Sequence, residues 1–444
     1  MKKLQAGTAI IDVTPNKPTF LHGYPHVERI SEGINDPLFA SALVLDSGVK
    51  QICFCAVDVI FISKEITKKV RKGVEAATGI PAHHIMVSAS HTHSGPVTVS
   101  DHFNDPVVPK ADPEYVAELI EKLKEVCVKA HINKRQSLIA LAVADGSGIG
   151  GNRRSKTDVV DAQVPVLVIK DAKTAKLVAL SVVCCMHPTV LHEDSKVVSG
   201  DFPGYARDFI RRELGKDVVM LYSMGPSGNQ SPRHFIKSNT LDEAKRLGEL
   251  LGKRILHAVN GLDDLDFQGE VALDIARSAL ELPRKKFMSL ASAMRKLEQL
   301  KAKLAKMRNE GAPLSEVRTV ECDWFGAEEN LHLAKMAADG TLEEVYRTVL
   351  PAEVTAVGIA GCWFVFLPGE LFVEYSLAIK ARAAKNTFVV SLSNGQLGGY
   401  IVTEEAEEEG GYEASNGIFS AGCGKILVNE VLALLQRNKE KVVG

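Results

Sequence analysis

The sequence predicts an α/β protein built from mixed β-sheets flanked by helices, with a helical insertion at about 283–345. Short apolar runs of strand length alternate with stretches whose apolar residues recur at helical spacing. The chain has 444 residues, of which 45% are hydrophobic, so a large buried core is available. No repeat or low-complexity linker divides it. We therefore expect one folded unit over residues 1–444, although length alone would suggest about three domains.

The individual elements follow from the same patterns, taken in chain order. Apolar runs predict strands at 51–61, 85–89, 137–144, 164–169, 178–186, 218–223, 352–367 and 387–392. Helical spacing predicts helices at 64–77, 114–130, 205–214, 240–259, 287–307 and 425–435. Because strands and helices alternate, we expect helices on both faces of a sheet. The helix at 287–307 carries Lys and Arg between its apolar positions, which is typical of a solvated surface helix.

Charge and composition exclude several classes of partner. The formal net charge of -2 provides no field that would attract a phosphate backbone, so nucleic acid is not expected as a partner. No window approaches the ~18 apolar residues of a spanning helix, so no integral membrane segment is expected. The N-terminal residues lack the apolar core of a signal peptide, and the eight cysteines form no CxxC pair. We expect a cytoplasmic protein with reduced cysteines, and the sequence leaves a homo-oligomer open.

Two histidines follow directly after the predicted strand at 85–89, in the segment Ser90-His91-Thr92-His93-Ser94-Gly95-Pro96. Alternate residues of an extended segment point to opposite sides, so both imidazoles could bind one metal ion only if the backbone turns. The simpler expectation is that one histidine is a ligand and the other faces a substrate. Two hydrogen-bonded loop histidines remain the alternative.

Other ligand-type residues stand at or beyond the ends of further predicted strands. His187 ends the run 178–186, Glu370 follows a Pro-Gly turn after the run 352–367, and Tyr400 follows the strand at 387–392. Strand ends are where α/β sheets place their ligands. Taken singly, His187 could be a structural histidine and Glu370 an exposed turn residue. Together the His, His, Glu and Tyr side chains suit a catalytic Zn²⁺ site with an open position.

A glycine-rich segment at 224–233 follows the predicted strand at 218–223. It lacks the GxGxxG and GxxxxGK[ST] spacings of nucleotide-binding loops, and it lacks the GxSxG of a nucleophile elbow. Its backbone N–H groups or the Ser231 hydroxyl could still bind a substrate oxygen.

Taken together, these segments resemble the neutral/alkaline non-lysosomal ceramidase family, zinc amidases that cleave the N-acyl bond of ceramide. The matching segments extend over nearly the whole chain in order: Ala6 to Pro15, Leu21-His22-Gly23-Tyr24, His91 to Pro96, Asn152-Arg153, His187-Pro188-Thr189, Ser199-Gly200-Asp201, Asn229 to Pro232, Pro368-Gly369-Glu370, Tyr400 to Thr403 and Tyr412-Glu413-Ala414. The resemblance implies that residues 1–444 form a ceramidase-like zinc hydrolase catalytic domain.

The resemblance also implies roles for individual residues. Zn²⁺ would be bound by His91, His187, Glu370 and Tyr400. The substrate would be lined by His93, Arg153, Tyr412 and the backbone at Gly23, with Arg154 as the alternative to Arg153. His93 would act as a general acid towards the leaving amine.

The sequence departs from the family in two respects, because we find neither its secretory signal nor its C-terminal immunoglobulin-like domain. We therefore expect hydrolysis of an amide or related acyl bond in a small soluble acyl substrate. Three alternatives stay open. They are a true ceramidase, a metal-independent serine hydrolase that uses Ser231 with His93, and a non-catalytic metal-binding protein.

Overall fold

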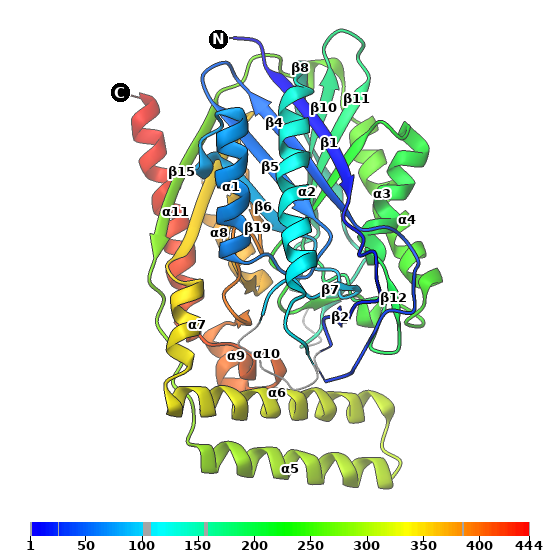
Figure 1. The fold of residues 1–444 in the computed structure, drawn as a ribbon, viewed down its shortest axis with the longest axis vertical. Coiled ribbons are helices and arrows are strands. Elements are labelled where there is room, and N and C mark those ends of the chain that lie inside the picture. Colours follow the sequence, from blue (N-terminus) through cyan, green and yellow to red (C-terminus); the bar gives the residue numbers. More distant parts are fainter. Residues whose placement is uncertain (1, 25, 101–107, 155–158, 384–385, 444) are drawn as a thin grey trace.

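The computed structural model describes residues 2–24, 26–100, 108–154, 159–383 and 386–443 (Figure 1). Its largest sheet has eight strands in the order β13-β11-β10-β8-β1-β4-β5-β6. These strands are β1 (Gln5–Asp12), β4 (Phe39–Asp46), β5 (Gln51–Val57), β6 (Ile85–Ala89), β8 (Arg135–Asp145), β10 (Gln163–Asp171), β11 (Leu177–Cys184) and β13 (Val219–Met224). Neighbours are antiparallel except for β5 with β6 and β11 with β13, so the sheet is mixed.

A second sheet of four strands has the order β15-β16-β17-β19. It consists of β15 (Leu273–Leu280), β16 (Ala352–Ile359), β17 (Cys362–Phe366) and β19 (Thr387–Val390). The sequence predicted one strand at 352–367, but the chain reverses at Ala360 and Gly361, which both have positive φ, and forms the antiparallel pair β16 and β17. The turn contains only Ala360 and Gly361, so no polar residue interrupts the apolar run and the sequence pattern did not indicate a break.

The two sheets pack face to face, and helices cover their outer surfaces. Residues of both sheets share one buried cluster, in which the rings of Phe54 and Phe366 stack 5.4 Å apart. The predicted α/β class with mixed sheets and flanking helices is confirmed. The expectation of helices on both faces of one sheet is wrong, because the inner face of each sheet is covered by the other sheet.

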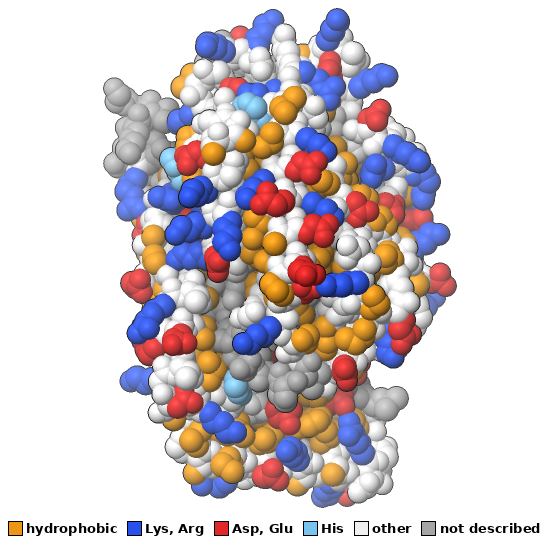
Figure 2. Space-filling view, in the orientation of Figure 1, with side chains coloured by type: hydrophobic (Ala, Val, Ile, Leu, Met, Phe, Trp, Pro, Cys, Tyr) orange, Lys and Arg blue, Asp and Glu red, His pale blue; other side chains and the backbone are white. Residues whose placement is uncertain are grey.

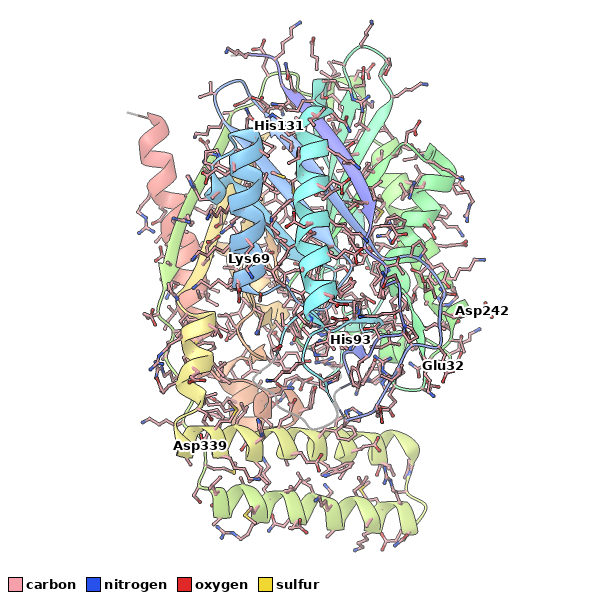
Figure 3. All side chains as sticks on the ribbon, in the orientation of Figure 1. Glu32, Lys69, His93, His131, Asp242 and Asp339 are labelled. Atoms are coloured by element: carbon pink, nitrogen blue, oxygen red, sulfur yellow. The ribbon has the colours of Figure 1, made fainter. Side chains whose placement is uncertain are left out.

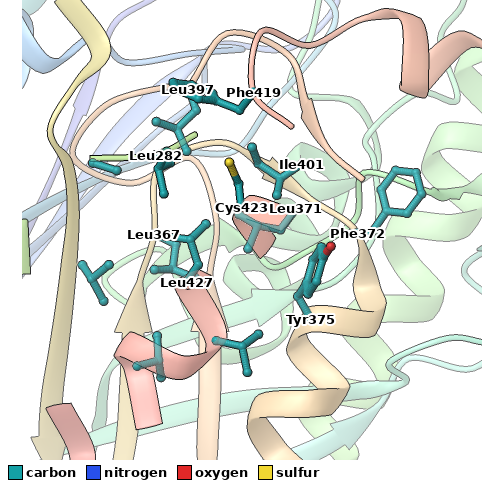
Figure 4. Close-up of a cluster of buried hydrophobic side chains, with 14 of the residues drawn as sticks. Leu282, Leu367, Leu371, Phe372, Tyr375, Leu397, Ile401, Phe419, Cys423 and Leu427 are labelled. Atoms are coloured by element: carbon teal, nitrogen blue, oxygen red, sulfur yellow. The ribbon is translucent and has the colours of Figure 1, made fainter. Parts of the chain in front are cut away.

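Four helices cover the eight-stranded sheet. They are α1 (Lys64–Thr78), α2 (Pro113–Ile132), α3 (Asp201–Leu214) and α4 (Leu241–Asn260). Ser63, Asp112 and Thr240 cap α1, α2 and α4 with their side chains. The four-stranded sheet is covered by α7 (Leu342–Val349), α8 (Val373–Arg382) and α11 (Gly422–Val443). Figure 4 shows part of this last core, where Leu367, Tyr375 and Leu427 are among the packed side chains.

Two long helices, α5 (Leu290–Asn309) and α6 (Leu314–Asp339), lie between β15 and α7 in the chain. In Figure 1 they run side by side across one end of the molecule, next to α9 (Glu404–Glu409) and α10 (Tyr412–Ser415). The backbone of Tyr412 lies against Gly326 of α6. Among the described residues, no helix combines the length and apolar content needed to cross a bilayer.

The close approach of α3 and α4 depends on a glycine. A Cβ atom at Gly248 would lie 2.4 Å from the Phe202 carbonyl oxygen and 2.5 Å from Tyr205 Cβ. We expect Gly248→Ala to lower the free energy of unfolding by about 1–3 kcal/mol, because the helices must separate to admit the methyl group. Chemical denaturation measures this. Gly261→Ala at the end of the same helix is the control: its methyl group meets nothing closer than 3.4 Å, so an equal loss there would contradict the packing argument.

Candidate metal centre

The site is formed where segments from the two sheets meet. His91 follows β6 and His187 follows β11, so both come from the eight-stranded sheet. Glu370 begins β18 (Glu370–Leu371) just after β17, and Tyr400 begins β20 (Tyr400–Ile401) after β19. The short strands β18 and β20 are parallel, with Glu370 directly opposite Tyr400. The four residues that the sequence predicted as ligands are therefore brought to one place by the packing of two sheets.

The imidazoles of His91 and His187 are held in the same way. His91 Nδ1 lies 2.9 Å from the Ile60 carbonyl oxygen, and His187 Nδ1 lies 2.6 Å from the Ser227 carbonyl oxygen. A carbonyl can only accept, so both Nδ1 atoms carry a proton, and each ring in its neutral form presents a lone pair on Nε2. Ligand histidines in metalloproteins are oriented by this kind of hydrogen bond.

Both lone pairs point at one carboxylate oxygen. Glu370 Oε2 lies 3.1 Å from His187 Nε2 and 3.3 Å from His91 Nε2. When both rings are neutral, three electron-rich atoms meet here in a buried space, which is unfavourable unless a cation lies among them. In a tetrahedral zinc site with bonds of ~2.0–2.2 Å, neighbouring ligand atoms are about 3.4 Å apart, so these residues fit such an ion.

The charges of the site reflect its burial. Burial alone would raise the pKa of Glu370, but His91 and His187 outweigh it and hold this pKa well below its usual range. Burial lowers the pKa of His187 to about 4, and that of His93 well below its usual value. At neutral pH the carboxylate is ionised and these two imidazoles are neutral, the states that metal ligation requires.

His93 reaches the same cluster because the backbone turns. His91 has a φ of 68°, and its N–H donates to the Val59 carbonyl oxygen at 2.9 Å, so the segment after β6 is not extended. The ligand-type atoms of His91, His93 and His187 all lie within 4.8 Å of one another. The alternation expected for the two histidines is therefore wrong, and both face the metal centre.

The surroundings of His93 nevertheless differ from those of the other two histidines. Neither of its ring nitrogens has a hydrogen-bond partner among the residues that the structure describes, although the side chain is only 9% exposed. Its ring packs on Gly23, where a Cβ atom would lie 2.5 Å from its Cγ and Nδ1. Gly23 also has a φ of 131°, a backbone conformation that favours glycine. Both the conformation and the close contact with His93 therefore require a residue without a side chain at this position. Figure 3 shows His93 near the end of the molecule where α5 and α6 lie.

Two adjoining cavities open at the centre. The larger has a volume of about 470 Å³ and the smaller about 60 Å³, and they share the lining residues Gly23, His93, Tyr400 and Tyr412. His91 and Glu370 line the smaller cavity, and Arg153 and Ser231 line the larger one. Every residue that the sequence proposed for the site thus faces one of the cavities except His187, which is fully buried behind them, and Arg154.

The structure separates the two candidate arginines. Arg153 lies with its guanidinium carbon 5.4 Å from the centre of the Tyr400 ring and donates to Glu413 and to the Gly228 carbonyl oxygen, both at 2.8 Å. Arg154 donates to the other Glu413 oxygen at 2.7 Å and to the Gly410 carbonyl oxygen at 2.8 Å, and it does not line the cavity. Arg153 is therefore the arginine that faces the site.

Sequence reasoning missed much of the cavity wall. His26, His192, Glu193, Arg233, Lys237 and Phe325 all line the larger cavity. It also missed Arg29, which is completely buried and donates to the backbone of Leu21, His93, His192 and Ser195. For three of these residues the sequence offered one signal, their closeness in the chain to predicted site residues. His192 and Glu193 lie shortly after His187, and Arg233 lies shortly after Ser231.

Comparison with known proteins finds a matching family model and solved structures of similar fold. Residues 4–144 match the family model of the neutral/alkaline non-lysosomal ceramidases, N-terminal. The neutral ceramidase from Pseudomonas aeruginosa has the same fold, with a TM-score of 0.75 and 16% sequence identity over 98% of this chain and 75% of that chain. The resemblance to the neutral ceramidases is confirmed. A ceramidase complexed with C2 is similar as well, with a TM-score of 0.74 and 14% identity over 99% of this chain and 76% of that chain.

The burial of His187 predicts a pH-dependent stability of the metal-free ceramidase-like protein. Its folded pKa of about 4 lies below the ~6.5 of an unfolded histidine, so unfolding takes up a proton between these values. The free energy of unfolding should therefore fall as the pH falls from about 6.5 to 4, with up to roughly 3 kcal/mol from this residue. We expect His187→Gln to flatten the profile measured by denaturation in chelator. Parallel profiles for the two proteins would contradict the assignment.

Proposed function

We propose that this chain is a ceramidase-like, zinc-dependent hydrolase that cleaves an amide or related acyl bond in a small soluble substrate. The observation that carries the proposal is the convergence of His91 Nε2 and His187 Nε2 on Glu370 Oε2 beside a cavity of about 470 Å³. His91, His187, Glu370 and Tyr400 would hold the ion. When bound, Zn²⁺ supplies an activated water and polarises the scissile carbonyl.

The remaining residues have separate tasks. His93 faces both cavities, and neither of its ring nitrogens is hydrogen-bonded to a described residue, so it can accept a proton from the attacking water and return it to the leaving amine. Tyr400 and Tyr412 border the same space and can donate their phenol hydrogens to the developing oxyanion. Arg153, fixed by Glu413 and Gly228, orients a carbonyl or carboxylate of the substrate.

The site supports the serine-hydrolase alternative and the non-catalytic metal-binding alternative less well. A serine hydrolase would need His93 hydrogen-bonded to Ser231, but in the described part of the chain His93 has no such partner, and Ser231 Oγ accepts from the Arg233 N–H at 3.2 Å. A non-catalytic metal protein would close its site with protein ligands. Here the centre adjoins a large cavity instead.

One observation favours true ceramidase activity as the second candidate. Met288, Leu290 and Met294, at the start of α5, are 38%, 38% and 56% exposed. Such a group of apolar side chains could meet a lipid aggregate, because α5 packs on α6, whose Cys322 and Phe325 line the cavity.

Metal analysis tests the ligand set. We expect His91→Ala, His187→Ala and Glu370→Gln to lose stoichiometric zinc while far-ultraviolet circular dichroism shows an intact fold. Tyr400→Phe should lose less, because a phenol is the weakest ligand of the four. His93→Ala is the matched comparison: it should keep its zinc and lose at least ~10²-fold in turnover, the usual scale for a lost acid or base. Loss of zinc in that variant would make His93 a ligand.

Turnover on two substrate classes tests the reaction. The zinc-loaded protein should hydrolyse water-soluble N-acyl compounds in preference to micellar ceramide, with activity abolished by a chelator and restored by zinc. A preference for ceramide of more than tenfold, about 1.4 kcal/mol in transition-state binding, would replace the soluble-substrate proposal by the second candidate. Activity that survives complete removal of metal would refute zinc dependence.

A further inference from the structure

The walls of the larger cavity carry an excess of positive charge. Among the residues that the structure describes, its lining includes Arg153, Arg233 and Lys237 and one carboxylate, Glu193. Arg153 is paired with Glu413 at 2.8 Å, so Arg233 and Lys237 account for the excess. Glu193 already lies 3.1 Å from His26 Nε2 and 3.8 Å from His192 Nδ1. The whole chain has a net charge of -2, and the face seen in Figure 2 mixes both signs of charge, so this excess is local to the cavity.

Two of these cations come from one small piece of structure. The strand β9 (Gly151–Asn152) pairs with β14 (Gln230–Ser231), and the Arg153 N–H donates to the Asn229 carbonyl oxygen at 2.8 Å. Arg153 follows β9 directly, and Arg233 follows β14 in the 3₁₀ helix η2 (Pro232–His234). The pairing therefore places a buried guanidinium near the metal centre and an exposed one further out on the same wall.

The segment that carries Arg233 and Lys237 is held in place on several sides. The Lys237 N–H donates to Glu243 of α4 at 3.1 Å, and Asn239 Nδ2 donates to the Val190 carbonyl oxygen at 2.9 Å. Arg246 donates to the Phe235 carbonyl oxygen at 2.9 Å. The Phe235 ring covers Gly151, where a Cβ atom would lie only 2.9 Å away. The two cationic side chains thus project from a fixed backbone, which lowers the entropic cost of binding.

From this arrangement we propose that the substrate carries an anionic group, a carboxylate or a phosphate, which Arg233 and Lys237 bind at the outer part of the larger cavity. The inference rests on the proposed hydrolase function and adds the substrate class. Guanidinium and ammonium groups form charge-assisted hydrogen bonds with both kinds of anion. A ceramide has no such group, so this wall distinguishes charged soluble acyl compounds from neutral lipids.

The test compares matched probes with the zinc-loaded protein. We expect kcat/KM to be at least about tenfold higher for N-acetylglycine or N-acetylethanolamine phosphate than for neutral N-acetylglycinamide, about 1.4 kcal/mol. The double variant Arg233→Ala/Lys237→Ala should lose this advantage, with kcat/KM falling at least about tenfold more for the anionic probes than for the neutral one. Lys245→Ala, an exposed lysine of α4 that does not line the cavity, should leave all rates unchanged. The advantage should shrink with added salt, because the two cations are exposed.

A binding experiment separates failure of this inference from failure of the proposed function. Calorimetry of the metal-free protein should show N-acetylglycine or N-acetylethanolamine phosphate bound more weakly by the double variant than by wild type, and the tighter probe identifies the anion. Hydrolysis with equal kcat/KM for charged and neutral probes in wild type would overturn the anion site while the hydrolase function stands. Absence of all hydrolysis, with anion binding that depends on Arg233 and Lys237, would overturn the function and leave the site.

Discussion

The structure of the site depends on one interaction, the approach of two imidazoles to a single buried carboxylate. His91 and His187 follow strands of the eight-stranded sheet, and Glu370 begins β18, just after β17 of the four-stranded sheet. The distances of 3.1 and 3.3 Å at Glu370 Oε2 are therefore set by how the two sheets pack on each other. The aromatic contact between Phe54 and Phe366 in the shared core contributes to the same spacing. The packing of the hydrophobic interface between the sheets therefore also determines the geometry of the candidate metal centre.

A second level of support lies behind the residues that face the cavities. Arg29 is fully buried, and its burial lowers its pKa to about 10, yet its guanidinium donates to four backbone carbonyl groups, including that of His93. Asp201 has a φ of 55° at the start of α3 and accepts from the Leu191 N–H at 2.9 Å. A residue held in this unfavourable region persists only where its surroundings impose it. These contacts fix the loop that connects His187 to His192 and Glu193.

The division of the space into two cavities suits a substrate with two different ends. A water needs ~10–15 Å³, so the smaller cavity of about 60 Å³ admits only a few heavy atoms. The larger cavity is lined by both polar and apolar side chains and is bordered by α6, where Phe325 stacks on His26 at 3.5 Å between ring centres. Helix α6 thus forms part of the cavity wall, far in sequence from the histidines.

Much of this protein was predictable from local sequence. The apolar runs and the helical spacing indicated most strands and helices, because burial imposes a period on each element separately. The sequence patterns did not predict the strands β1, β4 and β15 or the helices α6, α7 and α8. They also did not predict the turn that divides β16 from β17. The ligand-type residues at strand ends and their resemblance to ceramidases were also visible in the sequence. Only the tertiary structure decided that helices cover one face of each sheet, that His93 turns towards His91, that Arg153 and not Arg154 faces the cavity, and that Arg233 and Lys237 join it. The physical reason is that sheet packing and backbone turns bring together residues as far apart in the chain as Gly23 and Tyr412, and no local pattern records those contacts.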